Sequence, residues 1–449
     1  MLDEIMSIAI FLKNNLKNIP PNLGEIINRI PYSKRPGIGN VYKLRKKEIH
    51  DFELFSVEQK NDFIFKRMKN LVDYAYEEVV FYNEYYNQKG FHPDHLKTFE
   101  DIQRIPIVDK GTLNSYDIEK RSAKIKGRYI VNTGGSSGTP FSLYIQPDSM
   151  GHEWAHMHHI WEKLNFKASD LKIVFGGRSD LKKVVEYDVV RNHFAIDIYA
   201  DYKLVAEELK KILKKRKIKY LHGYPTSIYD FAVFCKKEDY ELQQLLSANL
   251  KGVFLGSEYP HEHYRNVIEN VFNVKTISWY GHTERAVLAY EKTEKFTYEP
   301  FGTYGFTEAL KFKDEYHLVG TSFYNFATPL IRYNTNDIIA DVKASNGILK
   351  SFKVTKGREG EFVIDKNNKN INLTGLIFGR HHEIFNHSKF IQVKQVKAGE
   401  IELHFVSDSI SEEEARNLFD LRNLDLDVAF VKRSEPFRTP SGKVNLLIK

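Results

Sequence analysis

The segment RYIVNTGGSSGTPFSLYI, residues 128–145, sets a loop rich in glycine and serine between two apolar runs. Its three glycines permit backbone angles that are barred to other residues, so consecutive N–H groups can turn toward one centre. Ser136, Ser137 and Thr139 add hydroxyl donors. Such a loop suits a polyphosphate, but it lacks the lysine of the GxxxxGK[ST] pattern, which argues against ordinary P-loop NTPase chemistry. Taken alone, the same composition also fits a simple hairpin or loop.

On either side of this loop, short apolar runs alternate with helical patterns. RYIVN, LKIVFGG and KYLHG read as strands, and residues 151–163 read as a helix between the first two. This alternation predicts an α/β body. Residues 1 to about 125 read as mostly helical, and residues 290–342 are short segments rich in Tyr and Phe with glycine turns. The pattern of residues 290–342 predicts antiparallel strands that close one side of the body.

The C-terminal stretch has a different order of elements. GEIELHFV, SEEEARNLFDL and DVAFVK read as strand, helix and strand, after an earlier strand. We therefore predict two parts: a large N-terminal body of several β-sheets flanked by helices, residues 1–357, and a small mobile α+β domain, residues 358–449. The hinge is expected at Lys356, Gly357 and Arg358.

Composition limits the class of protein. The chain has 449 residues, 42% of them hydrophobic and 28% charged, which is typical of a soluble globular protein with two or more domains. Its single cysteine, Cys235, rules out an intramolecular disulfide and a zinc site built from several thiolates. Asp3 and Glu4 stand where a signal peptide carries positive charge, and no apolar run has the length of a membrane span. These features predict a cytoplasmic protein.

The charge distribution leaves one question open. Lys and Arg number 66 against 59 Asp and Glu, and the resulting +7 is spread along the chain. The densest basic run, Lys210–Lys219, is interpreted as the solvated face of a helix that leads into a strand. The alternative is a surface that meets anionic lipid, glycan or nucleic acid, so peripheral membrane contact stays open. Nucleic acid is not expected as a substrate.

Five further motifs follow the glycine-rich loop in a fixed order. They are GSE (256–258), SWYGHTE (278–284), LIRYNTND (330–337), GREGEF (357–362) and TPSGKVNLL (439–447). With this order and spacing the chain resembles the adenylate-forming superfamily of acyl- and aryl-CoA synthetases and luciferase-like enzymes. Within it the chain is similar to the phenylacetate–CoA ligase group and to relatives associated with capsular polysaccharide biosynthesis. The segment AYEEVVFYNEYYNQKGFHPDHLKTFEDIQRIPIVDKGTL (75–113) is similar to the opening of that group.

The resemblance implies an ATP and Mg²⁺ site. It assigns the β- and γ-phosphates to a run of seven loop residues: Thr133, Gly134, Gly135, Ser136, Ser137, Gly138 and Thr139. Phe141 stands where the wider superfamily often has a lysine. Glu284 is the implied magnesium ligand, a hard oxygen donor for a hard cation. Asp337 is implied to accept hydrogen bonds from the ribose hydroxyls. Arg332 is expected to brace its own strand.

The adenine ring is implied to lie between Tyr280 on one side and Gly256, Ser257 and Glu258 on the other. Arg358 is implied to lie at the hinge, near ribose or phosphate. Lys443 matches the superfamily's catalytic lysine, which the small domain carries over the site to hold the carboxylate and stabilise charge on the α-phosphate.

By the same resemblance, the substrate carboxylate attacks the α-phosphorus, the small domain rotates, and an acceptor takes the acyl group. The acceptor is either CoA or an amine or hydroxyl on a sugar-linked precursor. Tyr224, Trp279 and His282 are expected in the acyl pocket. Histidines in HGYP and YGHTE suggest a polar acid, such as an amino acid or a sugar acid.

Two rival interpretations remain. HEWAH, residues 152–156, satisfies the HExxH zinc-hydrolase pattern, with His152 and His156 on one helical face and Glu153 as general base. No HxxGxxH extension follows, and the next glutamates are Glu162 and Glu186, which disfavours zinc. The same histidines, with His159, are expected to line or solvate the acyl pocket instead. The second rival is a non-catalytic binding scaffold, which the joint presence of Glu284, Asp337 and Lys443 disfavours.

Overall fold

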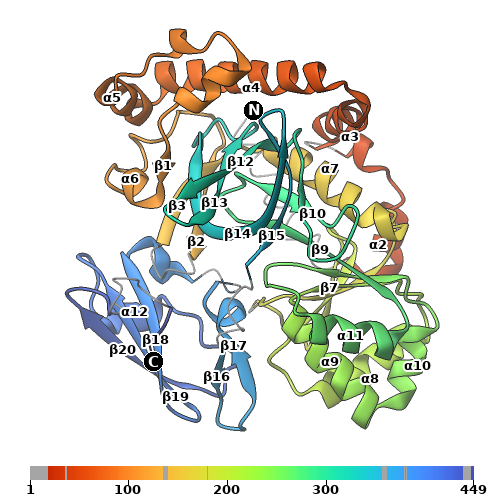
Figure 1. The fold of residues 1–449 in the computed structure, drawn as a ribbon. Helices are drawn as coiled ribbons and strands as arrows, with labels where there is room; N and C mark the ends of the chain where they lie inside the picture. Colours follow the sequence, from red (N-terminus) through yellow and green to blue (C-terminus); the bar gives the residue numbers. More distant parts are fainter. Residues whose placement is uncertain are drawn as a thin grey trace, which may run out of the picture.

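The computed structural model describes residues 19–35, 38–134, 140–178, 180–355, 362–378, 380, 382–437 and 446–448. The N-terminal part is helical, as predicted, and its helices α3, α4 and α5 run across the top of the molecule (Figure 1). The helix α4 begins with a capping box, in which Ser56 and Gln59 satisfy each other's free backbone N–H groups. In the described residues the α-helices of this part are α2 (Pro21–Ile27), α3 (Gly39–Leu54), α4 (Val57–Glu78), α5 (Val80–Gln88) and α6 (Lys110–Asn114).

An eight-stranded sheet forms the centre of the body, in the order β11-β10-β9-β8-β7-β4-β6-β5. The strands from β6 to β9 are parallel, as the alternation of strands and helices predicted. The strands are β4 (Lys172–Phe175), β5 (Val185–Asp188), β6 (His193–Ile196), β7 (Tyr220–Gly223), β8 (Gly252–Leu255), β9 (Lys275–Gly281), β10 (Leu288–Tyr290) and β11 (Glu299–Pro300).

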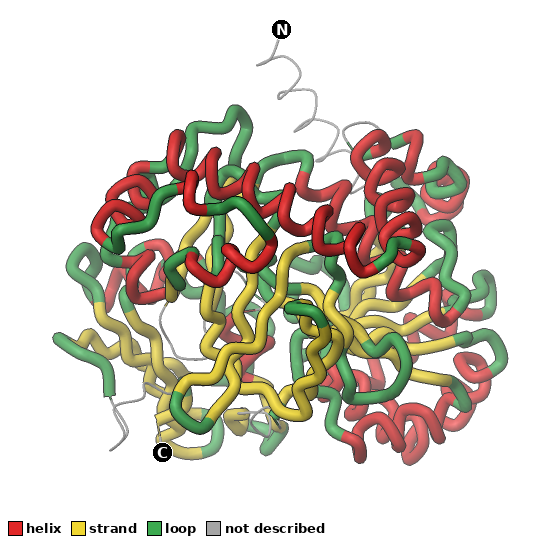
Figure 2. The backbone as a smooth tube through the Cα atoms, turned by 45° about the horizontal axis from the view of Figure 1, so that its top comes forward, coloured by secondary structure: helices red, strands yellow, loops and turns green. Residues whose placement is uncertain are grey.

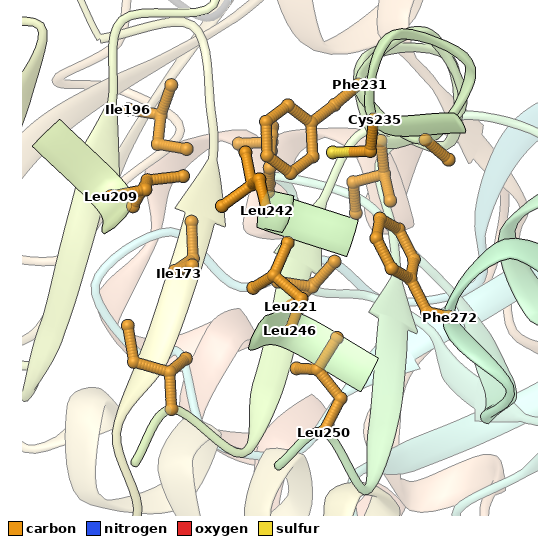
Figure 3. Packing of buried hydrophobic residues seen from close by; sticks show 14 of the residues in the cluster. Ile173, Ile196, Leu209, Leu221, Phe231, Cys235, Leu242, Leu246, Leu250 and Phe272 are labelled. Carbon is orange, nitrogen blue, oxygen red and sulfur yellow. The ribbon is translucent and has the colours of Figure 1, made fainter. Parts of the chain in front are cut away.

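Helices cover both faces of this sheet. Leu221 and Leu255 point to one face and pack against the helices that follow β6 to β8 (Figure 3). Tyr220 and Phe254, one residue away along each strand, point to the other face and pack against the helix after the hairpin. The helices on the first face are α8 (Tyr202–Leu213), α9 (Pro225–Glu238), α10 (Tyr240–Ser247) and α11 (Glu262–Phe272); α7 (Ser149–Trp161) covers the second.

The basic run was expected to be helical throughout. The structure ends α8 at Leu213, so only the first part of the run is helix and residues 217–219 are irregular before β7. Lys210 pairs with Asp239 and Lys214 with Glu241 on neighbouring helices. Part of this charge is therefore neutralised within the fold.

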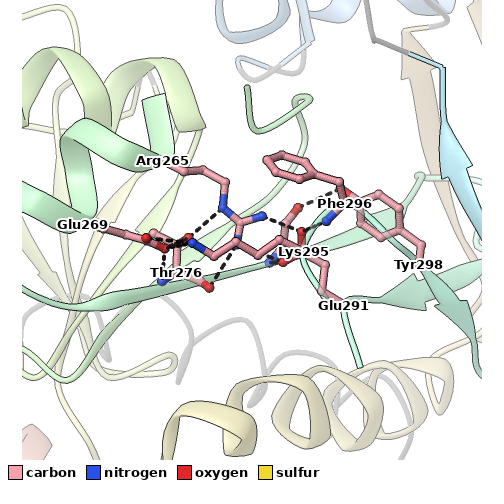
Figure 4. Close-up of polar contacts among 8 residues, drawn as sticks. Arg265, Glu269, Thr276, Glu291, Lys295, Phe296 and Tyr298 are labelled. Carbon is pink, nitrogen blue, oxygen red and sulfur yellow. Dashed lines mark hydrogen bonds and ion pairs between the residues drawn. The ribbon is translucent and has the colours of Figure 1, made fainter. Parts of the chain in front are cut away.

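A buried ion pair ties α11 to the sheet (Figure 4). Arg265 donates to the carboxylate of Glu291 at 3.0 Å and to the side chain and carbonyl of Thr276. Glu291 also accepts from the backbone N–H groups of Ser278 and Phe296. Both charged side chains are almost fully buried, so their mutual hydrogen bonds are what makes the burial tolerable.

Antiparallel strands close one side of the body, as predicted. Figure 2 shows these strands lying beneath the helices at the top of the molecule. The parallel strand β1 joins them by pairing Val108 with Tyr333 and Asp109 with Asn334. The elements are β1 (Val108–Asp109), β12 (Gly305–Phe312), β13 (Glu315–Ser322), β14 (Tyr333–Ser345) and β15 (Ile348–Val354), with a separate hairpin of β2 (Tyr129–Gly134) and β3 (Pro140–Ile145).

The C-terminal elements build a four-stranded sheet in the order β20-β19-β18-β21 with its own hydrophobic cluster, seen in blue in Figure 1. Lys369 donates to the carbonyls of Ile198, Tyr199 and Ala200 of the body, and Asn423 donates to Asp197. The elements are β16 (Phe362–Ile364), β17 (Asn370–Asn372), β18 (Phe390–Lys397), β19 (Glu400–Val406), α12 (Glu412–Asn417), β20 (Asp427–Arg433) and β21 (Leu447–Ile448).

The predicted fold class, α/β with several sheets flanked by helices and an α+β unit at the C-terminus, is confirmed. The single-turn helices are η1 (Tyr32–Lys34), η2 (Pro93–His95), η3 (Phe99–Arg104), η4 (Glu162–Leu164) and η6 (Glu383–Asn386), and η5 (Thr374–Phe378) is a π-helix. None of the helices in the described ranges combines the length and the apolar composition needed to cross a bilayer.

Candidate functional site

The carboxyl ends of β7, β8 and β9 open toward the predicted site. In open α/β sheets this edge is where ligands bind. At the end of β7, Gly223 has a φ of 152°, and a Cβ there would lie 2.1 Å from the carbonyl oxygen of Phe175. At the end of β8, Gly256 lies under the ring of Trp279, which a Cβ would meet at 2.5 Å. Both turns therefore depend on glycine to let the chain approach so closely.

Glu284, the predicted magnesium ligand, lies in the loop after β9 and is buried. One of its carboxylate oxygens lies 3.1 Å from Nδ1 of His282, and the other lies 3.9 Å from the ammonium of Lys110. Burial alone would raise the pKa of this carboxyl group, but His282 and Lys110 outweigh it and lower the pKa to about 2. Glu284 is therefore an ionised oxygen donor near neutral pH, which fits a divalent cation.

Lys110 was not predicted as a site residue. It begins α6, in the segment PIVDKGTL that supported the family resemblance, and Asp109 caps that helix by accepting from Thr112. The pairing of β1 with β14 brings this turn to Glu284, about 170 residues away along the chain. The only signal in the sequence was the resemblance of the segment itself, because the parallel pairing is invisible to local patterns.

Tyr280 and Asp337 lie together. The hydroxyl of Tyr280 on β9 donates to a carboxylate oxygen of Asp337 on β14. Burial and the charge of Asp337 raise the pKa of Tyr280 well above its ordinary value, so the phenol stays a donor. Asp337 follows a turn in which its own N–H donates to Thr335 and Asn336 has a φ of 62°. The turn fixes the direction of this carboxylate.

The GSE segment forms a bend after β8. Ser257 has a φ of 69°, and Glu258 turns back toward Thr226, whose hydroxyl donates to it at 2.7 Å. The other oxygen of Glu258 is buried and has no hydrogen-bond partner among the described residues. Burial raises the pKa of Glu258 to about 7, because the hydrogen bonds from Thr226 only partly offset it.

The start of the glycine-rich loop lies at the end of β2. Thr133 is buried, and its hydroxyl has no hydrogen-bond partner among the described residues. An orphaned donor at this place fits a ligand that brings oxygen atoms. Seven predicted site residues lie outside the described residues: Gly135, Ser136, Ser137, Gly138, Thr139, Arg358 and Lys443.

Of the predicted pocket residues, Trp279 belongs to an aromatic group. Its ring centre lies 5.6 Å from that of His222 and 6.3 Å from that of Trp161 on α7. His282 lies in the loop after β9, where its Nδ1 is within hydrogen-bond distance of Glu284. Tyr224 begins α9 and packs against Gly375 of the C-terminal part. That these three residues line one acyl pocket stays a prediction.

Arg332 braces the fold, as predicted. Its guanidinium pairs with Glu308 at 2.9 Å and donates to the carbonyls of Gln103 and Ile105 at 2.7 Å. It is buried and its donors are committed to these partners. Arg332 is thus a structural residue that joins β14, β12 and the segment before β1.

The zinc interpretation of HEWAH is wrong for the described residues, which contain no group of three side chains able to hold a metal ion. His156 is fully buried, with Nδ1 on the carbonyl of His152 and Nε2 on the hydroxyl of Thr303. Glu153 accepts from Tyr304. The histidines at positions 152 and 156 pack among aromatic rings, so they are core residues of α7.

Comparison with known proteins shows which proteins the chain is similar to. No family model matches the chain. Protein CapK of Staphylococcus aureus is 25% identical over 342 residues, which are 73% of this chain and 74% of that protein. A phenylacetate–coenzyme A ligase of Aromatoleum evansii is 33% identical over 80 residues, 18% of this chain and 16% of that protein.

Among solved structures, a 2-hydroxyisobutyryl-CoA ligase in complex with 2-HIB-AMP and CoA in the thioesterification state matches with a TM-score of 0.56 at 17% identity. The match covers 88% of this chain and 90% of that one. The fold is that of an adenylate-forming ligase. An open conformation of the same ligase matches with a TM-score of 0.53. The resemblance to the phenylacetate–CoA ligase group and its capsule relatives, predicted from the motifs, is confirmed.

Proposed function

We propose that the chain activates a carboxylate with ATP, forming an acyl-adenylate and releasing pyrophosphate, and then transfers the acyl group to an acceptor. The observation that carries the proposal is the meeting of Glu284, Lys110 and the Tyr280–Asp337 pair beside the ends of the parallel strands. These residues come from β9, α6 and β14, and they supply an anion, a cation and a fixed carboxylate. Those are the groups that a nucleotide and its metal require.

In this proposal the ionised Glu284 holds Mg²⁺, which neutralises charge on the phosphate oxygens when it is bound. Lys110 adds a second positive charge for a phosphate oxygen. Asp337 accepts from the ribose hydroxyls, and Tyr280 lies against the adenine with the bend at 256–258 opposite. Thr133, Gly134 and the following loop residues bind the β- and γ-phosphates through N–H and hydroxyl groups.

Catalysis in this scheme consists of positioning and charge stabilisation. The substrate carboxylate attacks the α-phosphorus in line, and the P–O bond to pyrophosphate breaks. We propose domains at residues 1–357 and 358–449, with the smaller one bringing Lys443 to the α-phosphate. Its rotation would then withdraw Lys443 and admit the acceptor, as lids do in other enzymes. Among the described residues the polar contacts between the two parts come from Lys369, Asn423, Arg380 and the Asn132–Asn386 pair, and such contacts are compatible with a movement of this kind.

The acceptor has two candidates. Transfer to an amine or hydroxyl of a sugar-linked precursor follows from the resemblance to relatives associated with polysaccharide biosynthesis. CoA is the alternative, because a solved structure with the same fold contains CoA and an acyl-AMP. Both share the adenylation step, so the first test addresses that step.

The test is ATP–pyrophosphate exchange on the full chain with a panel of carboxylic acids, with and without Mg²⁺. We expect at least one acid to stimulate exchange, and we expect chelation of Mg²⁺ to remove it. Hydroxylamine should trap the acid as a hydroxamate, and CoA in place of hydroxylamine separates the two acceptors. Binding of ATP without exchange for any amino, sugar, aliphatic or aromatic acid would refute the proposal in favour of a binding scaffold.

A further inference from the structure

A cavity of about 1470 Å³ is lined by α7, by the part of the sheet that contains β4, β5, β6 and β7, and by the C-terminal part through Arg380, His382, Glu383 and residues 417–422. Trp154, His158 and Trp161 line it from α7, at a spacing that puts all three on one face of the helix. Ligand pockets are usually about 300–1000 Å³. This cavity therefore has room for a molecule much larger than a simple aromatic acid.

The residues on the sheet side of the cavity, its floor, are determined by how β4 pairs with β6 and β7. Lys172 on β4 lies beside His193 on β6, and Val174 lies beside His222 on β7. Because Lys172 and Val174 are two residues apart, the strand pleat sends both to the same face. These four residues line the cavity.

Lys172 is an unusual residue for such a floor. Its side chain is 5% exposed, its ammonium donates to the carbonyl of Arg191 at 3.3 Å, and no described carboxylate lies within 4.0 Å of it. The rings of Phe166 and Trp161 lie 4.9 and 5.3 Å away. Burial lowers the pKa of Lys172 to about 7. Asp170 and Asp188 act on this ammonium from beyond 4.0 Å and only partly offset its burial. A buried cation without an adjacent anion is costly, so this position favours an anionic ligand.

The other cations that line the cavity already have partners. Each arginine lies within 4.0 Å of a carboxylate: Arg178 and Arg191 of Asp188, and Arg380 and Arg422 of Asp420. Nε1 of Trp161, Nε2 of His193, and Nε and Nη2 of Arg380 are buried without a hydrogen-bond partner among the described residues, and Nε2 of His193 lies 4.0 Å from Asp188. Lys172 differs from the four arginines in having no carboxylate of the described residues within 4.0 Å.

The inner end of the cavity adjoins the candidate site. His222 and Trp161 line the cavity, and their rings are the ones that approach Trp279, which covers Gly256. One aromatic layer therefore separates the cavity from the ends of β8 and β9. We propose that the cavity binds the distal part of the carboxylate substrate, and that this part carries a second anionic group that pairs with Lys172. This inference rests on the proposed function, since it takes adenylation to occur beyond Trp279.

Matched acids test the inference. Calorimetry without ATP would compare linear dicarboxylates from glutarate to azelate with monocarboxylates of the same length, from pentanoate to nonanoate. We expect the dicarboxylate of one length to bind at least about tenfold more tightly than its monocarboxylate, the size of a charge-assisted contact. Lys172→Met should abolish that preference while keeping the side-chain volume. Lys183→Met, at an exposed lysine that does not line the cavity, should preserve it.

The same acids in ATP–pyrophosphate exchange separate this inference from the proposed function. Exchange that prefers the monocarboxylates, or that is indifferent to Lys172→Met, overturns the inference and leaves adenylation intact. A dicarboxylate preference in binding without exchange by any acid supports the cavity assignment and contradicts adenylation. Equal or absent binding of both series overturns the inference. The comparison of acids on the unaltered chain holds even if Lys172→Met does not fold.

Discussion

At the scale of single residues, the candidate site contains buried carboxyl groups whose protonation depends on the neighbouring side chains. Glu284 is buried yet ionised, because His282 and Lys110 outweigh the cost of burial. Glu258 is also buried, but it has only neutral donors and its pKa rises to about 7. The two glutamates thus differ in average charge near neutral pH. The ionised Glu284 suits a cation, and the largely uncharged Glu258 suits the adenine ring.

The first prediction concerns Lys110. Lys110→Met should reduce ATP–pyrophosphate exchange by about 10- to 100-fold, because a preorganised cation beside Glu284 and the phosphates is lost. Lys126→Met removes an exposed lysine from the same region and serves as the matched control. Exchange of Lys110→Met within twofold of the unaltered chain would show that this lysine only supports Glu284 structurally.

The second prediction concerns pH. The folded-state pKa of Glu258, about 7, lies above its ordinary value of 4.5. Its contribution to stability is therefore complete below about pH 4.5 and is lost as the pH rises through 7. Without nucleotide, the unaltered chain should lose about 1–3 kcal/mol more between pH 5 and pH 8 than Glu258→Gln.

Urea unfolding at the two pH values measures this difference. Glu262→Gln, which changes an exposed carboxylate on α11, is the control and should keep the pH dependence of the unaltered chain. Equal pH dependence in Glu258→Gln and the unaltered chain would mean that Glu258 is ionised in the folded protein.

At the scale of elements, the ends of strands determine the site. The turn between β7 and α9 brings Gly223 so close to Phe175 that a Cβ would overlap its carbonyl oxygen, and Pro225 then starts the helix. Only the parallel neighbour β4 supplies the steric reason for glycine, since Phe175 lies opposite Gly223 in the register.

The third prediction tests this turn. Gly223→Ala should lower the free energy of unfolding by about 2–4 kcal/mol, because it adds both a clash and a strained φ of 152°. Gly90→Ala is a matched control with a φ of 65° and no atom within 4 Å of the added Cβ, so it should cost only about 1 kcal/mol. Urea unfolding checks both, and equal losses would contradict the steric account.

At the scale of the whole molecule, two hydrophobic units face each other with polar contacts between them. The C-terminal sheet has its own core, and its contacts with the body include Lys369, Asn423 and the hydrogen bond between Asn132 and Asn386. Asn132 lies on β2, next to the start of the glycine-rich loop. The C-terminal part is thus placed against the side of the body where the loop begins.

The fourth prediction concerns Lys443, which lies outside the described residues. Lys443→Ala should reduce ATP–pyrophosphate exchange at least about 100-fold, because it removes the cation assigned to the α-phosphate. The dissociation constant for ATP, measured by calorimetry, should change little. Lys432→Ala, at an exposed lysine on β20, is the control. Exchange near that of the control would remove the role given to Lys443.

The sequence by itself determined the α/β class, the helical N-terminus, the antiparallel strands after residue 290 and the family resemblance. These depend on local periodicity, turn chemistry and short motifs, which neighbouring residues carry. It also indicated that Arg332 braces its strand, which the ion pair with Glu308 confirms. It left HEWAH open between a zinc site and a position beside the acyl pocket, because a helical spacing fits both.

Only the tertiary structure decided the rest. It brought Lys110 to Glu284 through the pairing of β1 with β14, and it set Lys172 beside His193 on the floor of a large cavity. It also buried His156 against Thr303 and so removed it from any metal site. In each case the physical reason is the same: burial and charge pairing depend on segments that are far apart in the chain, and no local pattern records which of them will meet.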